Sequence, residues 1–169
     1  MRYITVSIVL LLMLSNCTAT HKTVQTMETP PNDTTQDTTP KVTGIGGVFF
    51  YAEDPKATKE WYAKNLGIEV NAWGAVFESR DKQNPEEIQS TAWNPFKQGD
   101  AYFSPSKKEF MINYRVQHIE ALVKKLKANG VTVLDEIATY EYGKFVHIMD
   151  AEGTKIELWE PTVDAHKHL

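Results

Sequence analysis

Between residues 44 and 161 the pattern of hydrophobic and polar positions occurs twice in the same order. Each copy opens with a run rich in β-branched and aromatic residues, Val48–Ala52 in the first and Ile112–Val116 in the second. Such runs are typical of strands. A helical segment follows each run and ends at a glycine, Gly67 or Gly130, as helix C-termini prefer. The pattern predicts a duplicated module.

The start of each predicted helix has its own signal. In the first copy Asp54 is a good N-cap, and Pro55 stands at the first helical position. In the second copy four apolar residues lie at i, i+3, i+4 and i+7, which predicts one buried helix face. These are Ile119, Leu122, Val123 and Leu126. His118 occupies the position that corresponds to Asp54 and is expected to cap poorly.

Short strand-like runs separated by turn signals follow each helix. In the first copy they are Ile68–Trp73, Ala75–Ser79 and Ser90–Asn94; in the second they are Thr132–Ile137, Phe145–Asp150 and Ile156–Trp159. The predicted fold class is α+β, with two tandem βαβββ modules at about residues 44–100 and 106–161. The repeat is too long for a solenoid.

Two motifs in these modules resemble those of a known superfamily. The first module contains Asp54-Pro55, Trp61-Tyr62 and Leu66-Gly67, and the second closes on Asp150-x-x-Gly153-x-x-Ile156-Glu157-Leu158. Together they resemble the vicinal oxygen chelate superfamily of glyoxalase-like, bleomycin-resistance-like and extradiol-dioxygenase-like proteins. The resemblance implies a cup-shaped mixed sheet with helices outside and a ligand inside. It does not fix the activity, since this fold carries many functions.

Composition and charge exclude several classes of protein. The 169 residues are 41% hydrophobic and 24% charged, with a formal net charge of −4, which gives no electrostatic basis for nucleic-acid binding. The single cysteine, Cys17, excludes an intrachain disulfide and a cysteine-based metal centre. Any metal ligands would be histidine, aspartate or glutamate.

The first 41 residues read as export and tethering segments. Residues 1–16 combine Arg2 with a short apolar run, the pattern of a secretory signal peptide. The run ends at Cys17, which resembles the lipid-attachment cysteine of bacterial lipoproteins; an ordinary secretory signal is the alternative. Residues 17–41, rich in threonine and proline, are expected to form a disordered tether. The expected location is the bacterial cell envelope, lipid-anchored to a membrane and facing away from the cytoplasm. A domain at 42–163 and a tail at 164–169 complete the chain.

The resemblance implies a test for a metal site. Metal-dependent members hold the ion with histidine on the first strand of each module and glutamate on the last. Aligning the modules puts Gly47 and Met111 at the two histidine positions, and only Glu157 matches a ligand position. One carboxylate does not form a catalytic divalent site. No cofactor is therefore expected, and a divalent metal is the disfavoured alternative.

The strand period of two predicts which side chains face the cup. Asn113 and Arg115 face inward from one strand, His147 from another and Glu157 from the last. The predicted ligand-binding residues are Asn113, Arg115, His147, Glu157, Phe49, Tyr51, Phe145, Trp159 and Trp93. A largely aromatic lining with a few convergent polar groups suits a small-molecule pocket. Arg115 and Glu157 are equally consistent with a structural ion pair, and His147 with a hydrogen-bonded wall residue.

Three functions from different classes remain open. The first is metal-independent binding of a small molecule in an aromatic-lined cup. The second is a metal-dependent glyoxalase-type lyase or isomerase with His147 and Glu157 as candidate catalytic residues. The third is a non-catalytic envelope interaction domain whose cup is filled by side chains. Expected partners are a small-molecule ligand, the membrane through the lipid anchor and, as an option, a second copy of the chain.

Overall fold

The computed structural model describes residues 37–82 and 84–165. The predicted signal peptide, Cys17 and most of the predicted tether and tail lie outside the described residues. Within the described residues, no helix is both long and apolar enough to cross a membrane.

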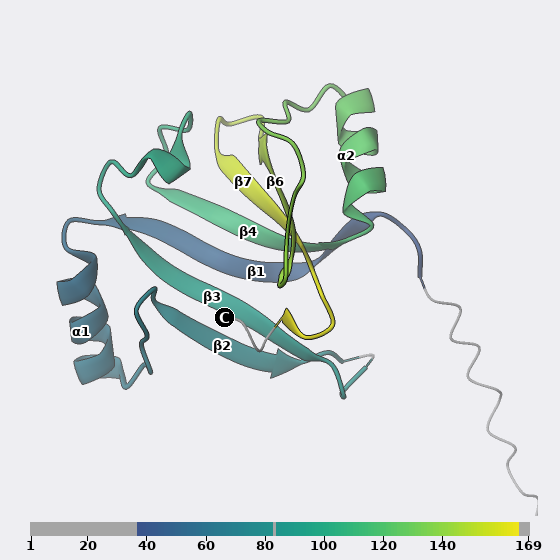
Figure 1. Ribbon diagram of the computed structural model, residues 1–169. Coiled ribbons are helices and arrows are strands. Elements are labelled where there is room, and N and C mark those ends of the chain that lie inside the picture. Colours follow the sequence, from purple (N-terminus) through teal and green to yellow (C-terminus); the bar gives the residue numbers. More distant parts are fainter. Residues whose placement is uncertain (1–36, 83, 166–169) are drawn as a thin grey trace, which may run out of the picture. The chain divides into compact units, whose positions relative to one another are not determined.

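Seven strands form one mixed sheet, accompanied by two α-helices (Figure 1). The elements are β1 (Lys41–Ala52), α1 (Pro55–Leu66), β2 (Ala75–Arg80), β3 (Ile88–Lys97), β4 (Phe110–Gln117), α2 (Ile119–Ala128), β5 (Ala138–Tyr140), β6 (Gly143–Met149) and β7 (Lys155–Pro161), with one 3₁₀ turn at Ala101–Phe103. The strand order is β2-β3-β1-β4-β7-β6-β5. The α+β class is confirmed, and the sheet is open rather than closed.

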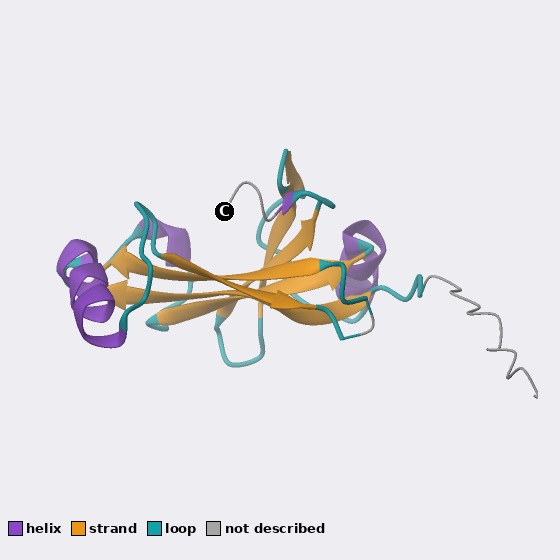
Figure 2. Cartoon of the chain, turned by 90° about the horizontal axis from the view of Figure 1, so that it is seen from below, coloured by secondary structure: helices purple, strands orange, loops and turns teal. Residues whose placement is uncertain are grey.

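The strand pairing repeats between the two modules. β1 runs parallel to β3, and β4 runs parallel to β7, so the first and last strands of each module are neighbours. An antiparallel pairing of β1 with β4 joins the modules. Figure 2 shows the long strands of the sheet nearly edge-on between α1 and α2, while other strands rise out of their plane. The internal repeat predicted from the sequence is thus a repeat of structure.

The helix boundaries follow from their end residues. The Asp54 carboxylate accepts hydrogen bonds from the amides of Lys56 and Ala57, both at 3.0 Å. Gly67 ends α1 in the left-handed conformation, with φ of 68°, as predicted. At α2 the His118 side chain makes no capping bond. The Glu160 carboxylate accepts from the His118 amide at 2.6 Å instead, so the last strand caps the second helix.

One predicted strand is wrong. Ile68–Trp73 forms no strand, and the first module has three strands instead of four. The Asn71 side chain accepts hydrogen bonds from the amides of Trp73 and Gly74, both at 2.9 Å, while the Asn71 amide bonds to the Gly74 carbonyl. This side-chain turn competes with the extended backbone that strand pairing needs.

A second predicted strand, Thr132–Ile137, is only partly present. An isolated bridge joins Val133 to Ile148, and regular pairing with β6 resumes in β5. Between the two lies Asp135, whose carboxylate accepts from the His147 amide at 2.8 Å. A side chain therefore replaces a backbone carbonyl at this point of the sheet edge.

The two faces of the sheet differ as the alternation predicts. On the α2 face, side chains of β4, β6 and β7 pack against the helix around Val116, Val146 and Leu158. On the other face Phe49, Phe103 and Met111 form a second core. This second face also carries the polar residues of the candidate site, because residues of each strand alternate in side-chain direction.

Candidate functional site

A cavity of about 530 Å³ opens on the sheet face away from α2. We call it the aromatic cavity, because eight aromatic side chains line it: Phe49, Trp73, Phe96, Tyr102, Tyr140, Tyr142, Phe145 and Trp159. The rings contact one another in pairs, as in the stacked Phe96 and Tyr102, with ring centres 5.5 Å apart. The volume and the lining suit a small organic molecule.

Glu157, on β7, is the centre of the polar groups in this cavity. It is only 3% exposed, and three donors surround its carboxylate. The Asn113 amide donates to Oε1 at 2.6 Å, the His147 ring nitrogen Nε2 lies 3.0 Å from Oε2, and the Tyr102 hydroxyl donates to Oε2. Asn113 faces Glu157 across the parallel β4–β7 pair, and His147 faces it across the antiparallel β6–β7 pair. Strand register therefore assembles this group.

Asp135 holds the other side of the His147 ring. Its carboxylate oxygen Oδ2 lies 2.5 Å from Nδ1 of His147. Burial lowers the pKa of His147, but the hydrogen bonds to Glu157 and Asp135 raise it by a larger amount. The pKa of His147 therefore lies above its usual value. Only the imidazolium form donates from both ring nitrogens at once. A protonated His147 between two carboxylates is the arrangement that satisfies all three groups.

Tyr102 covers Glu157 from the loop between β3 and β4. Burial, followed by the charge of Glu157, raises the pKa of the Tyr102 hydroxyl above its usual range, so the group remains a donor. The Lys155 ammonium donates to the Tyr102 carbonyl at 2.6 Å and lies 4.9 Å from the centre of its ring. Burial lowers the pKa of Lys155. These contacts hold the loop on the cavity floor.

Glu157 and His147 already have partners in the cavity, whereas the Oδ1 of Asn113 is buried without a hydrogen-bond partner among the described residues. Each Glu157 oxygen accepts a hydrogen bond, and both His147 ring nitrogens face carboxylates. Among the described residues, no group of three or more histidine, cysteine, aspartate or glutamate side chains is placed to hold an ion.

The strand register places two pairs of cavity residues opposite one another. Asn113 lies opposite Glu157 in the second module, and Phe49 lies opposite Asn94 in the first. All four line the aromatic cavity. Of the two positions that the sequence analysis aligns with histidine ligands, Gly47 has no side chain and Met111 is buried completely in the second core. The four facing positions contain one carboxylate, two amides and a phenyl ring, which does not fit a divalent metal site.

Most of the predicted site residues lie together. Asn113, His147, Glu157, Phe49, Phe145 and Trp159 all line the aromatic cavity. Tyr51 lies on the same face but stacks on Phe103, and its hydroxyl donates to the Asp100 carbonyl. Arg115 lines a separate cavity beyond Trp159 and does not pair with Glu157; it donates to main-chain carbonyls.

Trp93 requires a correction. It lies on the opposite face of β3, where its ring packs against Phe50 and Tyr62 of the α1 side. Its neighbours Ala92 and Asn94 are the residues that face the aromatic cavity. The alternation along the strand therefore removes Trp93 from the site.

The sequence reasoning missed several lining residues. The following lining residues are not among the predicted ligand-binding residues: Trp73, Phe96, Tyr102, Tyr140 and Tyr142. Asp135 was placed inside a strand. Aspartate is depleted in strands, so its presence in this predicted strand indicates that the side chain interrupts the regular strand pairing.

Comparisons with known proteins agree with this geometry. A model of the Glyoxalase/Bleomycin resistance protein/Dioxygenase superfamily matches residues 44–158. No curated protein sequence matches the chain.

Among solved structures, methylmalonyl-CoA epimerase from Mycobacterium tuberculosis is 23% identical, with a TM-score of 0.50 over 72% of this chain and 89% of that one. A single-residue variant of the Streptomyces coelicolor methylmalonyl-CoA epimerase, in complex with 2-nitronate-propionyl-CoA, is 17% identical, with a TM-score of 0.55 over 72% and 99%. A superfamily member from Vibrio splendidus 12B01 is 16% identical, with a TM-score of 0.43 over 72% and 99%. At these identities the likeness to the two epimerases supports the fold alone.

Proposed function

We propose, since the chain belongs to the Glyoxalase/Bleomycin resistance protein/Dioxygenase superfamily, that it binds an aromatic or amphipathic small molecule in the aromatic cavity without a metal ion. The observation that carries this proposal is the cavity itself, in which aromatic rings surround a carboxylate that three protein donors already satisfy. A metal ion would have to displace those donors.

The charges around the cavity favour a cationic ligand over an anionic one. Asp135, Glu136 and Glu157 line it, while His147 is the cationic side chain of the lining and Lys155 lies behind Tyr102. Aromatic faces also attract organic cations. The ligand class we propose is therefore a molecule with an aromatic or apolar body and an amine or quaternary ammonium group.

A thermal-shift screen of the purified full-length protein in EDTA tests the proposal. The probes are matched pairs of aromatic amines and aromatic carboxylates of the same size. We expect amines to raise the melting temperature and the matched carboxylates to do so less. Replacing Trp73, which lines the cavity, should reduce the shift, and replacing Trp61, an exposed residue on α1, is the matched control.

The competing functions give different outcomes. A metal-dependent lyase or isomerase would bind its ligand only when a divalent ion is present, and EDTA would abolish the shift. An interaction domain with a filled cup would show no shift with any probe. Either result would contradict the proposal.

A further inference from the structure

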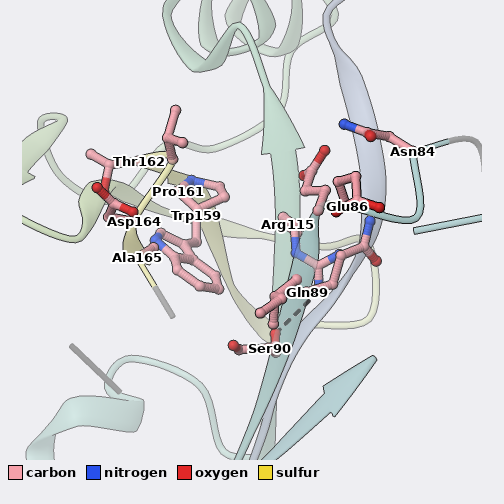
Figure 3. A pocket seen from close by; sticks show the side chains of 13 residues that line it. Asn84, Glu86, Gln89, Ser90, Arg115, Trp159, Pro161, Thr162, Asp164 and Ala165 are labelled. Carbon is pink, nitrogen blue, oxygen red and sulfur yellow. Dashed lines mark hydrogen bonds between the residues drawn. The ribbon is translucent and has the colours of Figure 1, made fainter. Parts of the chain in front are cut away.

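A second cavity, of about 540 Å³, lies on the same sheet face beyond Trp159, which lines both cavities. Its walls come from the loop before β3 and the start of β3, from β4, and from the end of β7 and the segment that follows it. We call it the arginine cavity after Arg115. In Figure 3 the Arg115 side chain lies between the side chains of Trp159 and Glu86, above Ser90. The Trp159 ring separates this cavity from the proposed site.

Arg115 is buried without a carboxylate in direct contact, although Glu87 and Asp81 act on its charge from a greater distance. It is only 6% exposed, and its Nη2 donates to the main-chain carbonyls of Ile45 and Ser90, both at 3.1 Å. Its Nη1 has no hydrogen-bond partner and lies beside Gly44, where an added Cβ would be 3.0 Å away. Among the described residues, no ion pair reaches this guanidinium. Buried arginines are normally paired, because an uncompensated charge is costly to remove from water.

A second orphaned group lies next to it. The Ser90 hydroxyl is buried and also lacks a hydrogen-bond partner, and Ser90 lines the same cavity. A guanidinium and a hydroxyl together offer the donors that a carboxylate accepts. Both orphaned atoms are shielded from solvent in this arrangement, so a carboxylate in the cavity would reach them only after the Arg115 side chain turned away from Gly44.

The entrance has the opposite charge. Glu86 and Glu87 line the cavity and are exposed, and Asp164 also lines it. A simple anion would meet these carboxylates on its way to Arg115, whereas a ligand with its own cationic group would gain from them.

We infer that the arginine cavity binds a small zwitterion of the amino-acid class, with its carboxylate on Arg115 and Ser90 and its ammonium group near Glu86 and Glu87. This site is distinct from the aromatic cavity and does not depend on the function proposed for that cavity.

Calorimetric titration of the full-length protein tests the inference. The probes are the proteinogenic amino acids, each compared with its amide, which lacks the carboxylate, and its N-acetyl derivative, which lacks the ammonium group. We expect at least one amino acid to bind with a Kd below about 1 mM. Both derivatives should bind at least about tenfold more weakly, since each loses a charge-assisted contact.

Variants distinguish binding from a structural role of Arg115. The Arg115→Gln variant should weaken amino-acid binding by about tenfold or more. The double variant Glu86→Gln/Glu87→Gln, at exposed positions where folding is not at risk, should narrow the preference for the amino acid over its N-acetyl derivative. Lys124→Gln, an exposed charge change on α2, is the control and should change neither.

Three results would overturn the inference. The first is that none of the amino acids binds at concentrations up to about 10 mM, tenfold above that Kd limit. The second is that the N-acetyl derivative binds as tightly as its parent amino acid. The third is that the double variant prefers the amino acid over its N-acetyl derivative as strongly as the unmodified protein does. If Arg115→Gln fails to fold, the double variant decides.

Discussion

The Glu157→Gln substitution tests the polar centre of the aromatic cavity. Glu157 is 3% exposed and accepts from Tyr102, Asn113 and His147. A glutamine has almost the same shape but carries one acceptor oxygen and one donor group. With the Asn113 amide held as it is, the glutamine amide points a donor at another donor, and the charge that pairs with His147 is lost.

The size of the effect follows from burial. Breaking a buried charged pair costs about 3–5 kcal/mol, and the remaining carbonyl of glutamine keeps part of the bonding, so we expect a loss of about 3 kcal/mol in the free energy of unfolding at pH 6. With a urea m-value of about 2 kcal/mol/M, the midpoint should fall by about 1.5 M.

Urea unfolding at two pH values provides the assay. At pH 9 the His147 imidazole is less protonated, so the loss caused by Glu157→Gln should shrink by about 1 kcal/mol. Glu78→Gln, at an exposed position on β2, is the control and should cost less than about 0.5 kcal/mol. A loss below about 1 kcal/mol that is equal at both pH values would refute the reasoning.

Three further predictions follow from the geometry. Because the pKa of His147 is raised in the folded state, its stabilising charge is fully present below the unfolded pKa of about 6.5 and is lost as the pH rises through the folded pKa. The urea midpoint should therefore fall over that pH range, and His147→Gln should flatten the dependence of the midpoint on pH. Gly67→Ala should cost about 1 kcal/mol in thermal unfolding, since Gly67 has φ of 68° and no atom within 4 Å of an added Cβ, so that only backbone strain acts. Trp73→Ala should leave stability within about 0.5 kcal/mol, because the residue is 79% exposed, yet weaken binding of a cationic aromatic probe about fivefold in a fluorescence titration; unchanged affinity would remove Trp73 from the site.

The sequence was sufficient for the parts of the fold that depend on local pattern. Alternation along β4, β6 and β7 assigned Asn113, His147 and Glu157 to one face, and the structure places them in contact. The helix ends at Asp54 and Gly67 were also readable, because capping depends on one or two residues.

The errors arose where side chains compete with the backbone. Asn71 closes a turn within the predicted strand Ile68–Trp73, and Asp135 replaces a strand carbonyl beside His147. Hydrophobicity does not distinguish a paired run from one that its own polar side chain folds back.

The pairing register of the strands was the other feature that the sequence did not reveal. The face on which Trp93 lies depends on how β3 pairs with β1, and that pairing involves residues distant in sequence. The separation of Arg115 from Glu157 by the Trp159 ring has the same origin, since a period of two places residues on a face without saying which cavity they reach.

Elemental analysis of the full-length protein, combined with melting scans in EDTA and in divalent ions, tests metal-independent binding most directly. We predict no stoichiometric divalent metal, no change in melting temperature on chelation, and ligand-induced stabilisation that persists in EDTA. A metal bound at about one per chain, whose removal lowers the melting temperature and abolishes ligand binding, would contradict the account. His147 and Glu157 would then be the first residues to replace.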